Sequence, residues 1–208
     1  MKFCAYFGKV IERGEKEHVI PRNLYPLTET NSTIQRITVL SCKDCNHSWA
    51  NDEAHFRNVL SCCGEPNIKR KALWDTKILR SFDKIDGDKR RRDLQELFKP
   101  IETKQGTRYM IYPAEDERVL RIIRKIIRGL SHYHKLETAI DDSRVWCDVL
   151  KYQVPDEFMK TMQFAHREED IIKYQFTKLD YQDLSSGWLL TFYENIKFIG
   201  IVHKKVPI

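Results

Sequence analysis

The chain has 208 residues, of which 41% are hydrophobic and 32% are charged; this is enough for one substantial domain, or for a small module joined to a larger one, and it excludes disorder throughout. Lys and Arg number 36 against 30 Asp and Glu, and the resulting net charge of +6 permits phosphate contacts without requiring them. No apolar run reaches about 18 residues and the first residues form no signal-peptide block, so we expect a cytoplasmic protein with no membrane partner.

The first third of the chain predicts a short strand followed by a helix. Residues 36–40 are rich in β-branched side chains and predict a strand. Residues 51–60 predict a helix, because two good N-cap residues open it and the apolar residues share one side. A Gly and a Pro break the pattern just afterwards, so we treat residues 1–63 as one module.

The remainder of the chain predicts a mixture of helices and strands. Helical patterns cover the basic span 68–82 and the span 117–130, whose basic residues we expect on a solvated face. The polar span 83–93 predicts an exposed connection, and residues 107–113 predict a strand. Alternation between residues 171 and 206 predicts two or three antiparallel strands, with a turn at 183–187.

The predicted fold class is therefore α+β, with a C-terminal region over residues 64–208 that would bind nucleic acid or a partner. Large aromatic residues are expected in its core, namely Trp74, Trp146 and Trp188. Two histidines are expected at a solvated helix end, namely His132 and His134.

Six cysteines are present, and two of them form the pattern Cys42-x-x-Cys45. Disulfides are disfavoured in a reducing cytosol. The spacing instead favours metal or redox chemistry, and no thioredoxin-like βαβ pattern surrounds the pair. We therefore expect these thiols to bind metal.

Glu17 and His18 lie upstream of the cysteine pair, and Asn46 follows it directly. An imidazole, with an ordinary pKa of about 6.5, is suited to act as a general base. A divalent cation held by a carboxylate and an amide oxygen would stabilise charge on a phosphodiester under attack. Hard oxygen ligands of this kind favour Mg²⁺ or Mn²⁺.

The segment Glu17-His18-Val19-Ile20-Pro21, followed by Cys42-Lys43-Asp44-Cys45-Asn46, resembles HNH (ββα-metal) endonucleases of the Glu-His, Cys-x-x-Cys-Asn type. The resemblance covers residues 3–60 and implies a ββα-metal module that hydrolyses DNA, with RNA as the alternative substrate. It implies His18 as the general base, Glu17 as a metal ligand and Asn46 as the last residue of the triad, in contact with the metal. It implies Asn31 as the middle residue, with Asn23 as the alternative.

Many such nucleases carry a structural zinc bound by two Cys-x-x-Cys pairs. Here Phe7 stands where the partner of Cys4 is expected, so three thiols remain: Cys4, Cys42 and Cys45. One interpretation takes the fourth ligand from His47, Cys62 or Cys63. The other holds that the zinc is lost and that Phe7 fills its space with apolar packing.

A module this small needs additional phosphate contacts to hold a duplex. The nearest basic stretch is Lys69-Arg70-Lys71, followed by Lys77 and Arg80. Arg70, Lys77 and Arg80 fall near one face of a regular helix. We expect this face to follow the phosphate backbone.

Two other functions compete with an endonuclease. The chain could be a non-catalytic nucleic-acid-binding subunit that keeps the ββα scaffold. It could also be a subunit of a bacterial defence or restriction assembly, whose C-terminal region binds a protein partner such as an ATPase or a sensor. The sequence has no P-loop motif, so any NTP-driven control would come from another chain.

Overall fold

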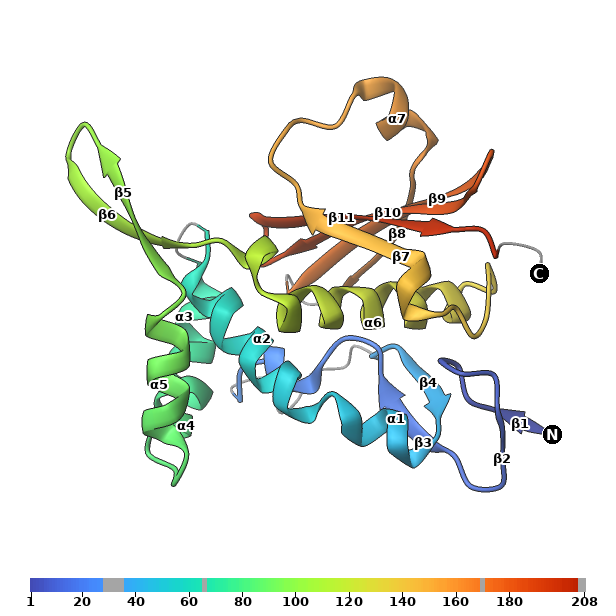
Figure 1. Ribbon diagram of the computed structural model, residues 1–208, viewed down its shortest axis with the longest axis horizontal. Coiled ribbons are helices and arrows are strands. Elements are labelled where there is room, and N and C mark those ends of the chain that lie inside the picture. Colours follow the sequence, from blue (N-terminus) through green and yellow to red (C-terminus); the bar gives the residue numbers. More distant parts are fainter. Residues whose placement is uncertain (28–35, 65–66, 169–170, 206–208) are drawn as a thin grey trace.

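The computed structural model describes residues 1–27, 36–64, 67–168 and 171–205. The fold is α+β with antiparallel sheets, as predicted. Figure 1 shows three layers: a large sheet, a central helix α6 (Glu117–Tyr133) beneath it, and the N-terminal elements on the other side of that helix. None of the described helices is long and apolar enough to cross a bilayer.

The N-terminal layer contains a hairpin followed by two helices. After the two-residue strands β1 (Lys2–Phe3) and β2 (Val10–Ile11), strand β3 (Glu15–His18) pairs antiparallel with β4 (Thr38–Ser41). Helices α1 (Lys43–Ser48) and α2 (Ala50–Cys62) follow directly. The strand and helix predicted for this third of the chain are thus confirmed, within two residues at each end.

Short helices and a hairpin connect this layer to α6. Helix α3 (Ile68–Leu73), a π-helical segment (Trp74–Ile78) and α4 (Leu79–Phe82) together cover the basic span predicted to be one helix. Helix α5 (Gly87–Gln95) replaces most of the connection predicted over residues 83–93, although that span is largely exposed as predicted. The ion pairs Asp86–Arg90 and Asp88–Arg91 and the buried Leu94 stabilise this helix.

The hairpin of β5 (Phe98–Thr103) and β6 (Gly106–Ile111) projects from the molecule (Figure 1). Only β6 is predicted from the sequence. The exposed side chains of β5 give it little alternation. Short 3-10 turns cover Arg22–Leu24, Pro113–Glu115 and Asp142–Arg144.

The large sheet has five antiparallel strands in the order β7-β11-β10-β9-β8. The strands are β7 (Val145–Val149), β8 (Gln163–Glu168), β9 (Ile172–Tyr181), β10 (Leu184–Phe192) and β11 (Ile196–His203). The short helix α7 (Asp156–Thr161) lies between β7 and β8. The three C-terminal strands confirm the predicted antiparallel strands, but β10 begins at residue 184, so most of the turn predicted at 183–187 is strand.

Helix α6 packs on both sides, which its sequence shows only in part. Six of its apolar residues are completely buried, namely Val119, Ile122, Ile123, Ile126, Ile127 and Leu130, and Leu120 is partly buried. Gly129 permits close approach to the N-terminal layer, because a Cβ there would lie 2.9 Å from Tyr6 Oη and from Val19 Cγ1. The expectation that all basic residues of this helix are solvated is wrong for Lys125 and Arg128, which are buried.

One hydrophobic core joins the predicted 1–63 and 64–208 parts. The rings of Phe56 and Phe192 meet edge to face at 5.5 Å. Tyr193 Oη donates a hydrogen bond of 2.7 Å to the carbonyl oxygen of Leu24. The module and the C-terminal region therefore stabilise one another.

The aromatic residues divide between this core and the surface. Trp188 is buried as predicted, Trp74 is half-buried, and Trp146 is wrongly predicted because half of its surface is exposed. His134 is not simply solvated: its Nε2 lies 2.9 Å from Tyr174 Oη, and its ring packs 4.5 Å from that of Phe176.

Candidate functional site

Three cysteines from separate parts of the N-terminal layer meet at the start of α1. Cys4 lies in the turn after β1, Cys42 is the N-cap of α1, and Cys45 lies one turn into that helix. The Sγ atom of Cys45 is 3.5 Å from that of Cys4 and 3.1 Å from that of Cys42. All three sulfur atoms lie within 4.8 Å of one another, so the group could hold a metal ion.

The surroundings of Cys4 and Cys45 shift their pKa values in opposite directions. Burial raises the pKa of Cys4, but backbone N–H groups of Cys42, Tyr6 and Phe7 outweigh burial and leave that pKa below its ordinary value. Burial and the neighbouring sulfur atoms raise the pKa of Cys45. Metal binding to these thiols would displace their protons, because thiolate is the form that binds metal.

No fourth protein ligand joins the three thiols among the residues that the structure describes. His47 lies 3.6 Å from Glu15 instead, and Cys63, beyond the far end of α2, has its Sγ 3.9 Å from the carbonyl oxygen of Ile111. Phe7 is more than half exposed, so its ring does not fill the space of a lost zinc. Three thiolates with an open fourth position fit zinc only if water or another molecule completes the tetrahedron.

His18 is half-buried at the end of β3. Burial lowers its pKa to about 4, and the positive charges of Arg22, Arg36 and Lys125 act in the same direction. The imidazole is therefore neutral at pH 7 and available to accept a proton. This is the protonation state that a general base needs.

Glu17 is buried and already paired. The fully buried ammonium group of Lys125 contacts the Glu17 carboxylate, lies 2.7 Å from Glu53 Oε1 and donates a 2.9 Å hydrogen bond to the carbonyl oxygen of His18. Burial raises the pKa of Glu17 in spite of this ion pair. In this arrangement Glu17 has no free oxygen-rich space for Mg²⁺ or Mn²⁺, and Lys125 is the residue that sequence analysis missed.

Asn46 lies beside Glu15 rather than Glu17. Its Nδ2 donates a 2.5 Å hydrogen bond to Glu15 Oε2. Glu15 and Glu17 occupy alternate positions of β3 and share one face, whereas His18 faces the other side. The described residues therefore do not place Glu17, His18 and Asn46 around one empty point. Asn31 lies outside the described residues.

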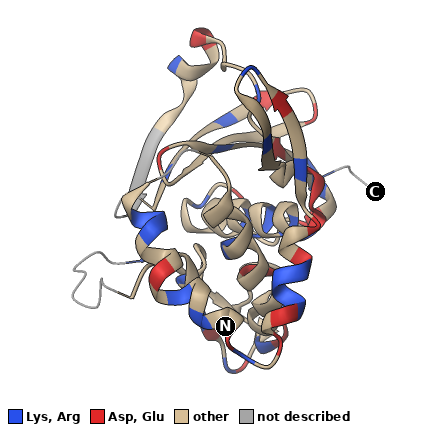
Figure 2. Cartoon of the chain, turned by 90° about the vertical axis from the view of Figure 1, so that its left-hand side faces the viewer, with Lys and Arg blue, Asp and Glu red and all other residues tan. Residues whose placement is uncertain are grey.

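The predicted phosphate-binding face does not exist as one surface. Arg70 is buried and donates to the carbonyl oxygen of Gly64 at 3.2 Å, whereas Lys71 pairs with Asp75 and Arg80 is exposed. The π-helical segment adds a residue to the turn and alters the spacing between Arg70 and Lys77. Figure 2 shows Lys and Arg spread over several elements with Asp and Glu among them.

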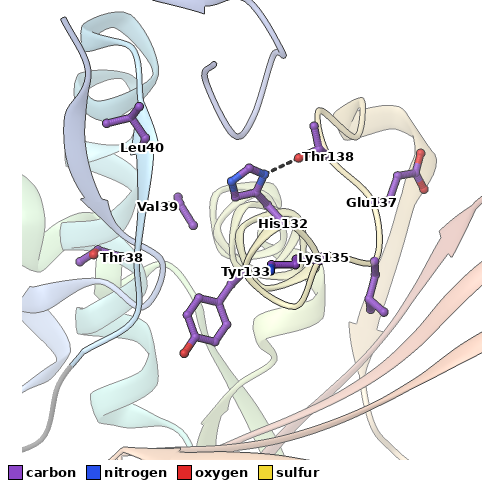
Figure 3. A pocket seen from close by; sticks show the side chains of 9 residues that line it. Thr38, Val39, Leu40, His132, Tyr133, Lys135, Glu137 and Thr138 are labelled. Atoms are coloured by element: carbon purple, nitrogen blue, oxygen red, sulfur yellow. Dashed lines mark hydrogen bonds between the residues drawn. The ribbon is translucent and has the colours of Figure 1, made fainter. Parts of the chain in front are cut away.

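A depression with a volume of about 640 Å³ lies between β4 and the end of α6, and none of the three cysteines lines it (Figure 3). His132 points into the space between β4 and Thr138, and its Nδ1 contacts Thr138 Oγ1. Burial lowers the pKa of His132. Glu137 also lines this depression, but its carboxylate pairs with Arg144, and His132 belongs to no group of three or more metal-binding side chains among the described residues.

Comparison with protein-family models, with curated protein sequences and with solved structures finds no match to this chain.

Proposed function

We propose that this protein is an HNH-type endonuclease that hydrolyses phosphodiester bonds in DNA with the help of Mg²⁺ or Mn²⁺. The observation that carries the proposal is the neutral His18 imidazole on β3, in a β3–β4–α1 arrangement that follows the Glu-His and Cys-x-x-Cys-Asn order. His18 would take a proton from the attacking water. The chemistry that a divalent cation supplies is stabilisation of charge on the phosphate.

The proposal requires a rearrangement of charged groups. Glu17 is paired with Lys125, and Asn46 with Glu15. Mg²⁺ is commonly bound through one or two carboxylates, with water and phosphate oxygens as its other ligands. Glu17 and Asn46 would have to exchange their present partners for the cation when nucleic acid binds.

The direct experiment is plasmid cleavage with Mg²⁺ or Mn²⁺, by the wild-type protein and by His18→Ala. Loss of a general base should slow cleavage by at least ~10²-fold. His132→Ala is the matched control, because His132 is also a half-buried histidine with a lowered pKa but lies outside the proposed site. Cleavage by His18→Ala at the wild-type rate would show that His18 is not the general base.

The second candidate function is a non-catalytic nucleic-acid-binding subunit. The Lys125–Glu17 ion pair favours it, because a buried ammonium group already neutralises the carboxylate that would bind metal. Such a subunit would bind DNA but leave it intact with any divalent cation. In a defence or restriction assembly, the C-terminal region would then hold the protein partner that cuts.

A further inference from the structure

A basic pocket includes two of the cations that act on His18. It has a volume of about 590 Å³ and is lined by Arg22, Asn23, Tyr25, Leu27, Arg36 and Lys77, together with Pro26. After burial, the charges of Arg22 and Arg36 have the largest effects in lowering the pKa of His18. The pocket and the imidazole therefore experience the same positive field.

Packing holds the cations of this pocket in place. The guanidinium carbon of Arg36 lies 4.0 Å from the centroid of the Tyr25 ring. Lys77 Nζ donates a 3.2 Å hydrogen bond to the carbonyl oxygen of Arg22, which joins the π-helical segment to the turn after β3. Arg36 and Lys77, from distant parts of the chain, are thus positioned before any ligand arrives.

The cations of the pocket have no acidic partner among the residues that the structure describes. No acidic side chain in the described ranges forms an ion pair with Arg22, Arg36 or Lys77. Burial lowers the pKa of Lys77 to about 8, and Arg57, Arg36 and Arg22 act in the same direction. Neighbouring cations without an anion destabilise the folded state, and an anion in the pocket would relieve their repulsion.

We infer that Arg22, Arg36 and Lys77 form a binding pocket for a backbone phosphate of the nucleic acid. Two guanidinium groups suit the paired anionic oxygens of a phosphodiester, and the ammonium group adds a point charge. The pocket is open to solvent, as a polymer that passes through it requires. The inference rests on the proposed function for the link to cleavage, because it sets a phosphate of the substrate strand near His18.

The test is the salt dependence of equilibrium binding to a fluorescent DNA duplex, measured with EDTA so that no cleavage occurs. Each lost phosphate contact should lower the slope of log K against log salt by about one. The pocket binds one phosphate, so Arg22→Gln/Arg36→Gln should lower the slope by about one, and Lys77→Gln by up to about one. Arg80→Gln is the matched control, since Arg80 is exposed in the same helical region and does not line the pocket.

Lys77→Gln also guards against misfolding, because Arg36 packs on Tyr25 and its loss could disturb that turn. Thermal melting of each variant identifies any that is unfolded. Inorganic phosphate should displace the duplex from the wild type beyond a chloride control of equal ionic strength, and this excess should vanish in Lys77→Gln. Wild-type slopes in folded pocket variants, or an excess displacement that persists in Lys77→Gln, would overturn the inference.

The outcomes for the pocket and for the nuclease are separable. Lower slopes together with His18-independent cleavage would remove the proposed catalytic role and leave the pocket. Unchanged slopes together with His18-dependent cleavage would remove the phosphate pocket and leave the catalytic role of His18.

Discussion

Among single residues, Lys125 has the largest effect on the candidate site, because its ammonium group is fully buried between Glu17 and Glu53. The sequence pattern supplies His18 and Asn46 as candidates, since their order along the chain is specific. It cannot supply Lys125, because a basic residue on an amphipathic helix is normally solvated. The carboxylates that bury it lie more than 70 residues away, on β3 and α2.

Lys125→Met tests how strongly this network holds the fold. It leaves two carboxylates in the protein interior without their cation, so the free energy of unfolding should fall by ~3–5 kcal/mol. Urea denaturation measures the change. Adding Glu17→Gln and Glu53→Gln should recover most of the loss, because no unpaired charge then remains.

Arg121→Met is the control for Lys125→Met. Arg121 pairs with Asp52 on the same two helices, but 42% of its side chain is exposed. An exposed pair contributes about 0–1 kcal/mol. If both variants lose the same stability, the buried network is not the stabilising feature described here.

At the scale of secondary-structure elements, the sequence predicts strongly periodic segments well and polar ones poorly. Helix α6 and the strands β9, β10 and β11 follow their apolar patterns. Helix α5 does not, because ion pairs and one buried leucine stabilise a segment whose composition resembles a loop. The spacing of apolar residues does not reveal a π-helical segment, although such a segment rotates Lys77 away from its position in a regular α-helix. The run of basic residues in the sequence therefore predicts the phosphate-binding surface incorrectly. The fold brings together Arg22, Arg36 and Lys77, which are far apart in the sequence.

Gly129→Ala tests the packing of α6 against the N-terminal layer. Alanine would raise helix propensity by about 1 kcal/mol relative to glycine. The added Cβ would lie 2.9 Å from Tyr6 Oη, and such overpacking typically destabilises by about 1–3 kcal/mol. We expect the overpacking to outweigh the gain in helix propensity, so the melting temperature should fall. A higher melting temperature would mean that the helix and the N-terminal layer are less closely packed.

For the whole molecule, the shared core means that gain or loss of metal at the three thiols should change the stability of the entire chain. Cys4, Cys42 and Cys45 connect the N-terminal turn to α1, and α1 leads into α2, which packs on α6. The three thiols meet as predicted. The local Cys-x-x-Cys spacing explains why Cys42 and Cys45 are close, whereas Cys4 is expected beside them only from the family resemblance. The sequence cannot predict that Phe7 is exposed, because this depends on the conformation of the turn after β1.

Elemental analysis of protein purified without added metal should find either about one zinc per chain or none. If zinc is present, Cys42→Ser should release it and lower the melting temperature of the whole chain, because structural zinc contributes folding free energy. Cys62→Ser is the control, since Cys62 lies at the other end of α2, outside the cluster. A zinc-free protein whose stability is indifferent to Cys42→Ser would show that the cluster has no structural role.

The pH dependence of single-turnover plasmid cleavage tests whether His18 acts as a neutral general base at physiological pH, as we propose. A histidine whose pKa is lowered to about 4 remains deprotonated above that value. The His18-dependent rate, taken as wild type minus His18→Ala, should therefore hold level down to about pH 5 and decline towards pH 4. A decline with a midpoint near the ordinary value of about 6.5, or a wild-type profile that His18→Ala reproduces, would contradict the account.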